Sequence, residues 1–143
     1  MANLITANDS KLLFTALGAN GVFSSVSGLT MVLASNSLAN FLGISQPQMI
    51  FELGIMLIGF GALLIYFYRR KRVHVANAIA ITVLDLAWVA GSAILVVAMP
   101  DLFSSAGMVS VIAVAVVVLM LFDLQAYAIW RARRITLRAA PGA

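Results

Sequence analysis

The sequence predicts an all-α membrane protein, a bundle of four transmembrane helices. The first observation is composition: 63% of the residues are hydrophobic and 10% are charged, whereas soluble domains hold about 45–50% apolar and about 25% charged residues. The second is that the apolar residues form four runs, each close to the roughly 20 residues with which a helix crosses a bilayer. The third is that basic residues gather at the ends of these runs. With so few charges, lipid must solvate most of the surface.

The four apolar runs define the expected helices of one transmembrane domain that covers residues 1–143. They are residues 12–35, 48–68, 75–99 and 106–130. Unsatisfied backbone groups are costly in lipid, so we expect helices there rather than strands. Short connections are expected between the helices, and residues 131–143 are expected to form a basic cytoplasmic tail.

The basic residues predict the orientation. Eight of the nine Lys and Arg residues lie in the second connection or the tail, and Lys11 precedes the first helix. All three places fall on one side of a four-helix bundle. Cytoplasmic loops are enriched in Lys and Arg, so both termini are expected in the cytoplasm. Anionic lipid headgroups, rather than nucleic acid, are the expected partners of the basic residues. These residues are Arg69, Arg70, Lys71, Arg72, Arg131, Arg133 and Arg134.

The first and third expected helices carry similar residues at an offset of 65. Asn20 corresponds to Asp85, Phe23 to Trp88, and Ser27 to Ser92. The second and fourth helices both end with aromatic residues followed by basic ones. Such a repeat would make two parallel helical hairpins about an axis along the membrane normal.

Several kinds of chemistry find no support in the sequence. The chain has no cysteine and one histidine, His74, so we expect no thiolate or multi-histidine metal site. Phosphate-binding, metalloprotease and serine-hydrolase motifs are absent. We therefore expect no enzyme activity, no metal and no cofactor.

Asp85 is the main candidate functional residue. It lies about ten residues inside its expected helix, which is about 15 Å at 1.5 Å per residue. A carboxylate at that depth costs several kcal/mol unless it is paired, protonated or hydrated. Ser92 shares its face of the helix, and Trp88 is close enough to donate an indole N–H.

The first expected helix presents a matching polar face with Asn20, Ser24 and Ser27. We expect this face to pack against the third helix, with Asn20 donating to the carboxyl of Asp85. Small residues such as Ser24 and Gly28 permit close approach of the helices. The functional interpretation is a polar site for a proton or a ligand. The alternative is a buried hydrogen bond that only sets helix register. The candidate site comprises Asp85, Asn20, Ser24, Ser27, Trp88 and Ser92.

Glu52 and Asp123 are secondary candidates. Glu52 lies near the start of its helix, where it can favour the positive end of the helix dipole; the alternative is a gate or ligand residue. Asp123 is expected to pair with an arginine that reaches back from a basic cluster. The alternative is a proton relay from Asp123 toward Asp85.

Two short stretches resemble a group of small bacterial four-helix membrane proteins that are mostly uncharacterised. The stretches are Asn20-Gly21-Val22-Phe23-Ser24 with Ser27-Gly28, and Asp85-x-x-Trp88-Val89-x-Gly91-Ser92. The resemblance implies a bacterial cytoplasmic (inner) membrane protein and no particular activity. Small multidrug transporters are a poorer match, because they carry their essential carboxylate in the first helix and residues 12–35 contain none.

Two functional hypotheses follow. The first is a small accessory or structural membrane protein, oligomeric or a subunit of a larger complex. The alternative is a small proton-coupled transporter or channel that uses Asp85 in a mid-membrane polar site. Gly54 and Gly61, if they face lipid, would favour a second copy of the chain or another membrane protein as partner.

Overall fold

The structure, a computed structural model, describes residues 4–139, with side chains through residue 134. Within that range the chain forms five α-helices, one 3-10 turn and two short strands. In chain order these are β1 (Leu4–Thr6), α1 (Lys11–Leu33), α2 (Ser35–Leu42), α3 (Pro47–Arg70), β2 (Arg72–His74), α4 (Val75–Ala98), η1 (Pro100–Leu102) and α5 (Ser105–Ala139).

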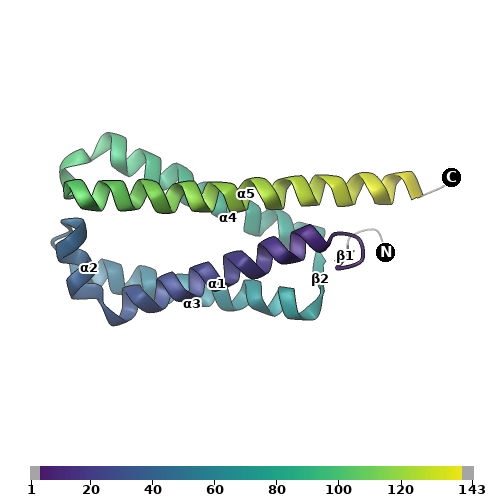
Figure 1. Cartoon of the computed structure of the whole chain (residues 1–143), viewed down its shortest axis with the longest axis horizontal. Helices are drawn as coiled ribbons and strands as arrows, with labels where there is room; N and C mark the ends of the chain where they lie inside the picture. Colours follow the sequence, from purple (N-terminus) through teal and green to yellow (C-terminus); the bar gives the residue numbers. More distant parts are fainter. Residues whose placement is uncertain (1–3, 140–143) are drawn as a thin grey trace.

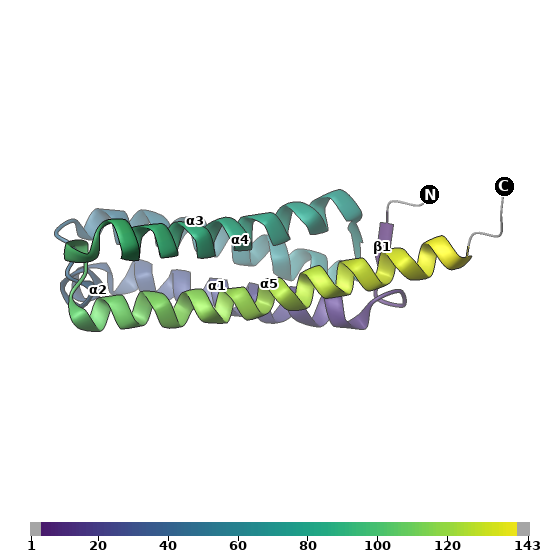
Figure 2. The same ribbon diagram turned by 90° about the horizontal axis from the view of Figure 1, so that it is seen from above.

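The four long helices lie at the corners of a square. Figure 1 shows α1 and α3 in one layer and α4 and α5 in the other, and Figure 2 shows α5 beside α1. The close helix pairs are α1 with α3, α4 with α5, and α1 with α5. Helices α1 and α4 are therefore diagonal neighbours. The prediction that they pack face to face is wrong, because α5 packs against α1 in that place.

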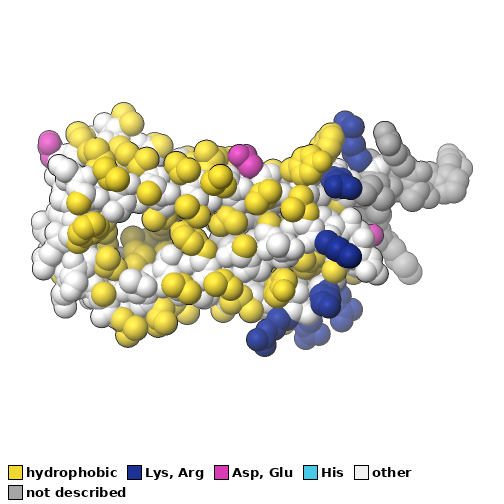
Figure 3. Space-filling model, in the orientation of Figure 1, with side chains coloured by type: hydrophobic (Ala, Val, Ile, Leu, Met, Phe, Trp, Pro, Cys, Tyr) yellow, Lys and Arg dark blue, Asp and Glu magenta, His cyan; other side chains and the backbone are white. Residues whose placement is uncertain are grey.

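All four long helices are apolar and long enough to cross a membrane, which suggests a multi-pass membrane protein. The candidate spans are Lys11–Leu33, Pro47–Arg70, Val75–Ala98 and Ser105–Arg134. Figure 3 shows hydrophobic side chains over the length of the bundle and the Lys and Arg side chains at one end. A face of this kind suits contact with lipid tails.

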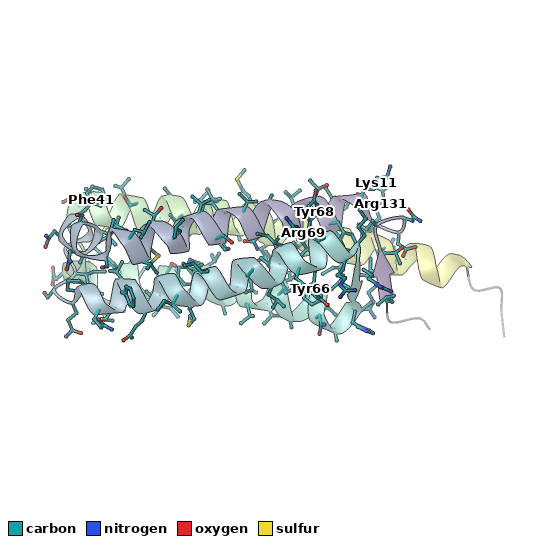
Figure 4. The ribbon with its side chains drawn as sticks, turned by 90° about the horizontal axis from the view of Figure 1, so that it is seen from below. Lys11, Phe41, Tyr66, Tyr68, Arg69 and Arg131 are labelled. Carbon is teal, nitrogen blue, oxygen red and sulfur yellow. The ribbon has the colours of Figure 1, made fainter. Side chains whose placement is uncertain are left out.

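Tyrosines accompany the basic residues at that end. Figure 4 shows Lys11, Tyr66, Tyr68, Arg69 and Arg131 together at one end of the bundle, and Phe41 at the other. The prediction that the basic clusters share one side is confirmed within the described residues. Aromatic and basic side chains together are typical of a membrane–water interface.

A two-stranded antiparallel sheet closes this end of the bundle. Thr6 pairs with Arg72, and Ile5 pairs with Val73. The side chains of Ile5 and Val73 are buried and join the hydrophobic core. The sequence did not predict this sheet, because three-residue strands carry too little periodicity to be recognised.

Helix α2 occupies most of the segment expected to be a plain connection, residues 36–47. Gly43 follows it with φ of 85°, a left-handed conformation that glycine adopts without steric cost. Ser104 ties α2 to the start of α5, because its hydroxyl donates to the carbonyl of Phe41 at 2.5 Å and accepts from the N–H of Gly107 at 2.9 Å.

Glycines make the interface between α1 and α3. A Cβ atom at Gly54 would lie 2.8 Å from the carbonyl oxygen of Gly28, and one at Gly61 would lie 2.8 Å from that of Gly21. Small residues at seven-residue spacing on both helices permit this approach. Gly54 and Gly61 do not face lipid, because both are buried against α1, so the condition under which they would favour a partner is not met.

The last helix is longer than expected. Helix α5 continues past residue 130 to Ala139, so the residues of the expected basic tail are helical up to that point, and residues 140–143 lie outside the described part. The hydrophobic core lies in the half of the bundle toward the sheet, where Leu13, Leu17, Leu64 and Ile81 pack with Ala128 and Ile129.

Candidate functional site

Asp85 lies at the centre of the bundle, on the face of α4 that points inward. Its side chain is 4% exposed. The amide of Asn20 donates to Oδ2 of Asp85 at 2.7 Å, and the amide of Gln125 donates to the same oxygen at 2.7 Å. One carboxyl oxygen therefore joins α1, α4 and α5. The predicted contact between Asn20 and Asp85 is confirmed, and it bridges the diagonal of the square.

Asn20 is held in place from its own helix. The hydroxyl of Ser24, one turn further along α1, donates to Oδ1 of Asn20 at 3.2 Å. Both residues are buried. Since the oxygen of the Asn20 amide accepts from Ser24, its nitrogen is directed toward Asp85. Asn20 and Ser24 thus act as a pair, as residues four apart on a helix can.

Gln125 is the site residue that sequence reasoning missed. It is fully buried, and its Oε1 has no hydrogen-bond partner among the described residues. Leaving such an acceptor unpaired costs about 1–3 kcal/mol. The sequence marks Gln125 only as an uncharged amide within an apolar run; that Val118, Gln125 and Ala132 form one buried stripe of α5 is seen only in the structure. A polar side chain within such an apolar stripe points toward a partner inside the bundle.

A cavity of about 620 Å³ lies beside this hydrogen-bonded group, in the half of the bundle toward α2. All six predicted site residues line it, including Ser27, Trp88 and Ser92. Figure 3 shows the surface hollowed between the two helix layers in this region. The rest of the lining is mainly apolar and aromatic. It includes Phe23, Met31, Leu38, Phe41, Leu42, Met56, Leu57, Phe60, Leu84, Val111, Val114 and Val118, together with Ser110.

Trp88 does not donate to Asp85 as expected. It is exposed in part and lines the cavity, while the second donor to the carboxyl is Gln125. The reason is geometric: α5 lies against α4, so a side chain from the neighbouring helix reaches the carboxyl from the inner side.

The two secondary candidates lie away from this group. Glu52 is exposed near the start of α3 and accepts a hydrogen bond from Gln48 at 3.1 Å. Asp123 is exposed on the outer face of α5, and its expected pairing with an arginine is not found among the described side chains. Neither residue lines the cavity.

The chemistry of the cavity follows from its lining. Asp85 is the one acidic residue in it, and no Lys, Arg or His among the described residues lines it. Both hydrogen bonds to Asp85 fall on Oδ2, so Oδ1 accepts none from the described residues. Within these residues no three His, Cys, Asp or Glu side chains come together as a metal site would need. The arrangement offers a single acidic group, able to hold a proton or face a ligand, at the wall of an apolar chamber.

Comparison with known proteins adds no relative. No protein-family model, no curated protein and no solved structure matches the chain.

Proposed function

We propose that the chain is a small membrane transporter that binds a ligand in the central cavity and exchanges it for a proton on Asp85. The observation that carries the proposal is that Asp85 and the other five candidate residues line one cavity. Ionisable residues inside a membrane are expensive and mark proton or substrate pathways by default. The cavity volume also falls in the range of about 300–1,000 Å³ that small-molecule sites occupy.

The distribution of charge supports an orientation with both termini in the cytoplasm. The described Lys and Arg residues gather at the end formed by the sheet, and the cavity lies toward the opposite end, beside α2. In this proposal the basic end faces anionic headgroups of a bacterial inner membrane. The cavity then opens nearer the outer leaflet. Because four helices form a thin bundle, a second copy of the chain would complete the transport pathway.

Proton movement across a membrane tests the proposal even while the ligand is unidentified. Wild-type and Asp85→Asn protein would be reconstituted in liposomes that enclose a pH-sensitive dye and screened with cationic, neutral and anionic solutes. We expect at least one class to evoke a proton flux that Asp85→Asn abolishes. Asn keeps an oxygen for the two amide donors, so this variant should retain the fold.

Thiol labelling gives an independent readout, because the natural chain has no cysteine. We expect water-soluble thiol reagents to modify Ser27→Cys and Ser92→Cys in liposomes. Ala78→Cys is the matched control, since Ala78 is fully buried on α4. If no solute evokes an Asp85-dependent proton flux, or if both cavity cysteines are as unreactive as the control, the transport proposal is wrong.

A second candidate function is an accessory or structural membrane protein, alone or in a larger complex. The observation that favours it is the near-complete burial of Asp85 with two amide donors from two other helices. Such a contact sets helix register without any ligand. In this case Asp85→Ala would lower the thermal stability, Asp85→Asn would behave like wild type in every assay, and cavity cysteines would stay unreactive.

A further inference from the structure

We propose that the ligand of the central cavity is a lipophilic organic cation that pairs with Asp85 and competes with its proton. This inference rests on the proposed function and adds the chemical class of the ligand. Three features of the lining carry it: the sign of its one ionisable group, its aromatic side chains, and the shortage of other oxygen ligands.

The charge is the first feature. Asp85 is the sole acidic side chain in the cavity, and no basic residue of the described chain lines it. The carboxyl receives two amide hydrogen bonds on Oδ2, from Asn20 and Gln125. Oδ1 takes none within the described part of the chain, so it is the oxygen left for a ligand. An ionised carboxylate in a low-dielectric chamber attracts a positive group strongly, whereas an anionic ligand would be repelled.

The aromatic lining is the second feature. Phe23 from α1, Phe60 from α3 and Trp88 from α4 all border the cavity with Asp85. The faces of aromatic rings attract cations, most strongly in desolvated sites. Met31 and Met56 also line the chamber, and methionine side chains adapt to ligands of different shape.

The third feature separates an organic cation from a metal ion. Hard metal ions need about six oxygen ligands, while the lining has one carboxyl and a few serine hydroxyls in a mainly apolar wall. A hydrated ion would lose its water shell there without replacement. A cation that carries its own apolar groups keeps hydrophobic contact with the wall, and the volume of about 620 Å³ gives it room.

Proton competition follows from the same geometry. The groups that face Asp85 from the neighbouring helices are the amides of Asn20 and Gln125, and neither titrates. Glu52 and Asp123 are exposed on the outside of the bundle. Protonation of Asp85 therefore removes the one charge that holds a cation in the cavity, so binding should weaken as pH falls.

Two probes of the same shape and opposite charge test the class of ligand. Tetraphenylphosphonium and tetraphenylborate would be titrated into purified full-length Trp130→Phe protein, in which Trp88 is the single tryptophan. We expect tetraphenylphosphonium to change Trp88 fluorescence in a saturable way, with weaker binding at lower pH. Tetraphenylborate should leave the fluorescence unchanged.

Matched variants separate Asp85 from general charge effects. Asp85→Asn should weaken tetraphenylphosphonium binding by about tenfold or more, the effect of about 1.4 kcal/mol, and should remove the pH dependence. Asp123→Asn deletes the same charge from the outer face of α5 and should bind like its parent. If Asp85→Asn fails to fold, Ser27→Phe, which fills the chamber and keeps the carboxyl, should also block binding.

Equal binding of the two probes, or equal affinity of Asp85→Asn and Asp123→Asn, would overturn the inference and indicate an apolar cavity that accepts any lipophile. The proposed function has a separate outcome. If another class of solute evokes an Asp85-dependent proton flux while tetraphenylphosphonium does not bind, the ligand class is wrong and transport stands. If no solute evokes such a flux and tetraphenylphosphonium does not bind, both proposals fail.

Discussion

The side chain of Asn20 donates a 2.7 Å hydrogen bond to Asp85, a residue 65 positions further along the chain and on the diagonally opposite helix. The offset of 65 residues is also the one that relates the similar residues of α1 and α4. Asn20 and Asp85 are thus equivalent positions of these two helices, and they face each other inside the bundle. Gln125 completes the group from α5. Three helices, two of them diagonal neighbours, are therefore joined at one carboxyl oxygen.

Replacement of Asp85 should separate its charge from its role as an acceptor. Asp85→Asn keeps an oxygen for both amides and should melt close to wild type. Asp85→Ala leaves the amides of Asn20 and Gln125 without a partner and should cost about 1–3 kcal/mol. Thermal unfolding followed by circular dichroism in one detergent would compare the three proteins. Equal stability of Asp85→Ala and wild type would contradict the predicted role of this acceptor.

The glycine contact between α1 and α3 should tolerate no added side chain. Gly61→Val places a Cβ against Ser25 and 2.8 Å from the carbonyl oxygen of Gly21, and overpacking of this kind costs about 1–3 kcal/mol. Gly59→Val is the matched control on the same helix, because a Cβ there meets no atom within 4 Å. The free energy of unfolding in detergent is the measurement. Helix propensity by itself favours Val over Gly at both positions, so an equal loss in the two variants would show that close packing at Gly61 is not the cause.

Gln125 should contribute less to stability than Asn20. Gln125→Leu removes one hydrogen bond to Asp85, but it also removes the buried Oε1 that has no partner among the described residues. The two effects oppose each other, so we expect a change below about 1 kcal/mol. Asn20→Leu removes a hydrogen bond to Asp85 and the acceptor of Ser24, with no compensating gain. The same unfolding measurement ranks them, and a larger loss for Gln125→Leu would show that this reasoning is wrong.

Asp9, in the turn before α1, should give a pH-dependent contribution to stability. The hydroxyl of Thr6 and its backbone N–H donate to this carboxylate at 2.6 and 2.8 Å and hold the pKa of Asp9 below its ordinary value of 3.8. The contribution is therefore present above about pH 3.8 and is lost as the pH falls through the folded pKa.

Thr6→Val removes the hydroxyl donor and should raise the pKa of Asp9 toward 3.8, as followed by NMR titration of the side-chain carboxyl. The stability advantage of wild type over Thr6→Val should then shrink below pH 3.8. Asp9 is largely exposed, so the effect is small. An unchanged pKa in Thr6→Val would show that the hydroxyl does not stabilise the charged form.

Several features were predictable from sequence because their signals are local. Apolar runs of about 20 residues mark α1, α3, α4 and α5. In lipid, such a segment satisfies its backbone hydrogen bonds by forming a helix. Asp85 stood out because a charge at that depth must find partners. Asn20 was predicted to be the partner of Asp85 because it lies at a similar depth on the uncharged first helix. The structure confirms the hydrogen bond between Asn20 and Asp85.

Other features depended on which helix faces meet, which no single segment encodes. Gly54 and Gly61 form a stripe in the sequence, but only the packing of the helices shows that the stripe lies on α1 rather than facing lipid. The same holds for the diagonal placement of α1 and α4. Helix α2 and the small sheet were missed because short elements depend on contacts with distant residues, such as Ser104 with Phe41.

Hydropathy and charge along the chain were enough to establish four membrane-length helices, the clustering of basic residues at one end, and a polar pair at Asn20 and Asp85. Helix packing added Gln125 to the pair and opened a cavity beside it. The physical reason is that hydropathy and charge are properties of single segments. Gln125 is uncharged and inconspicuous in its helix, and it becomes a site residue only because α5 packs against both α4 and α1.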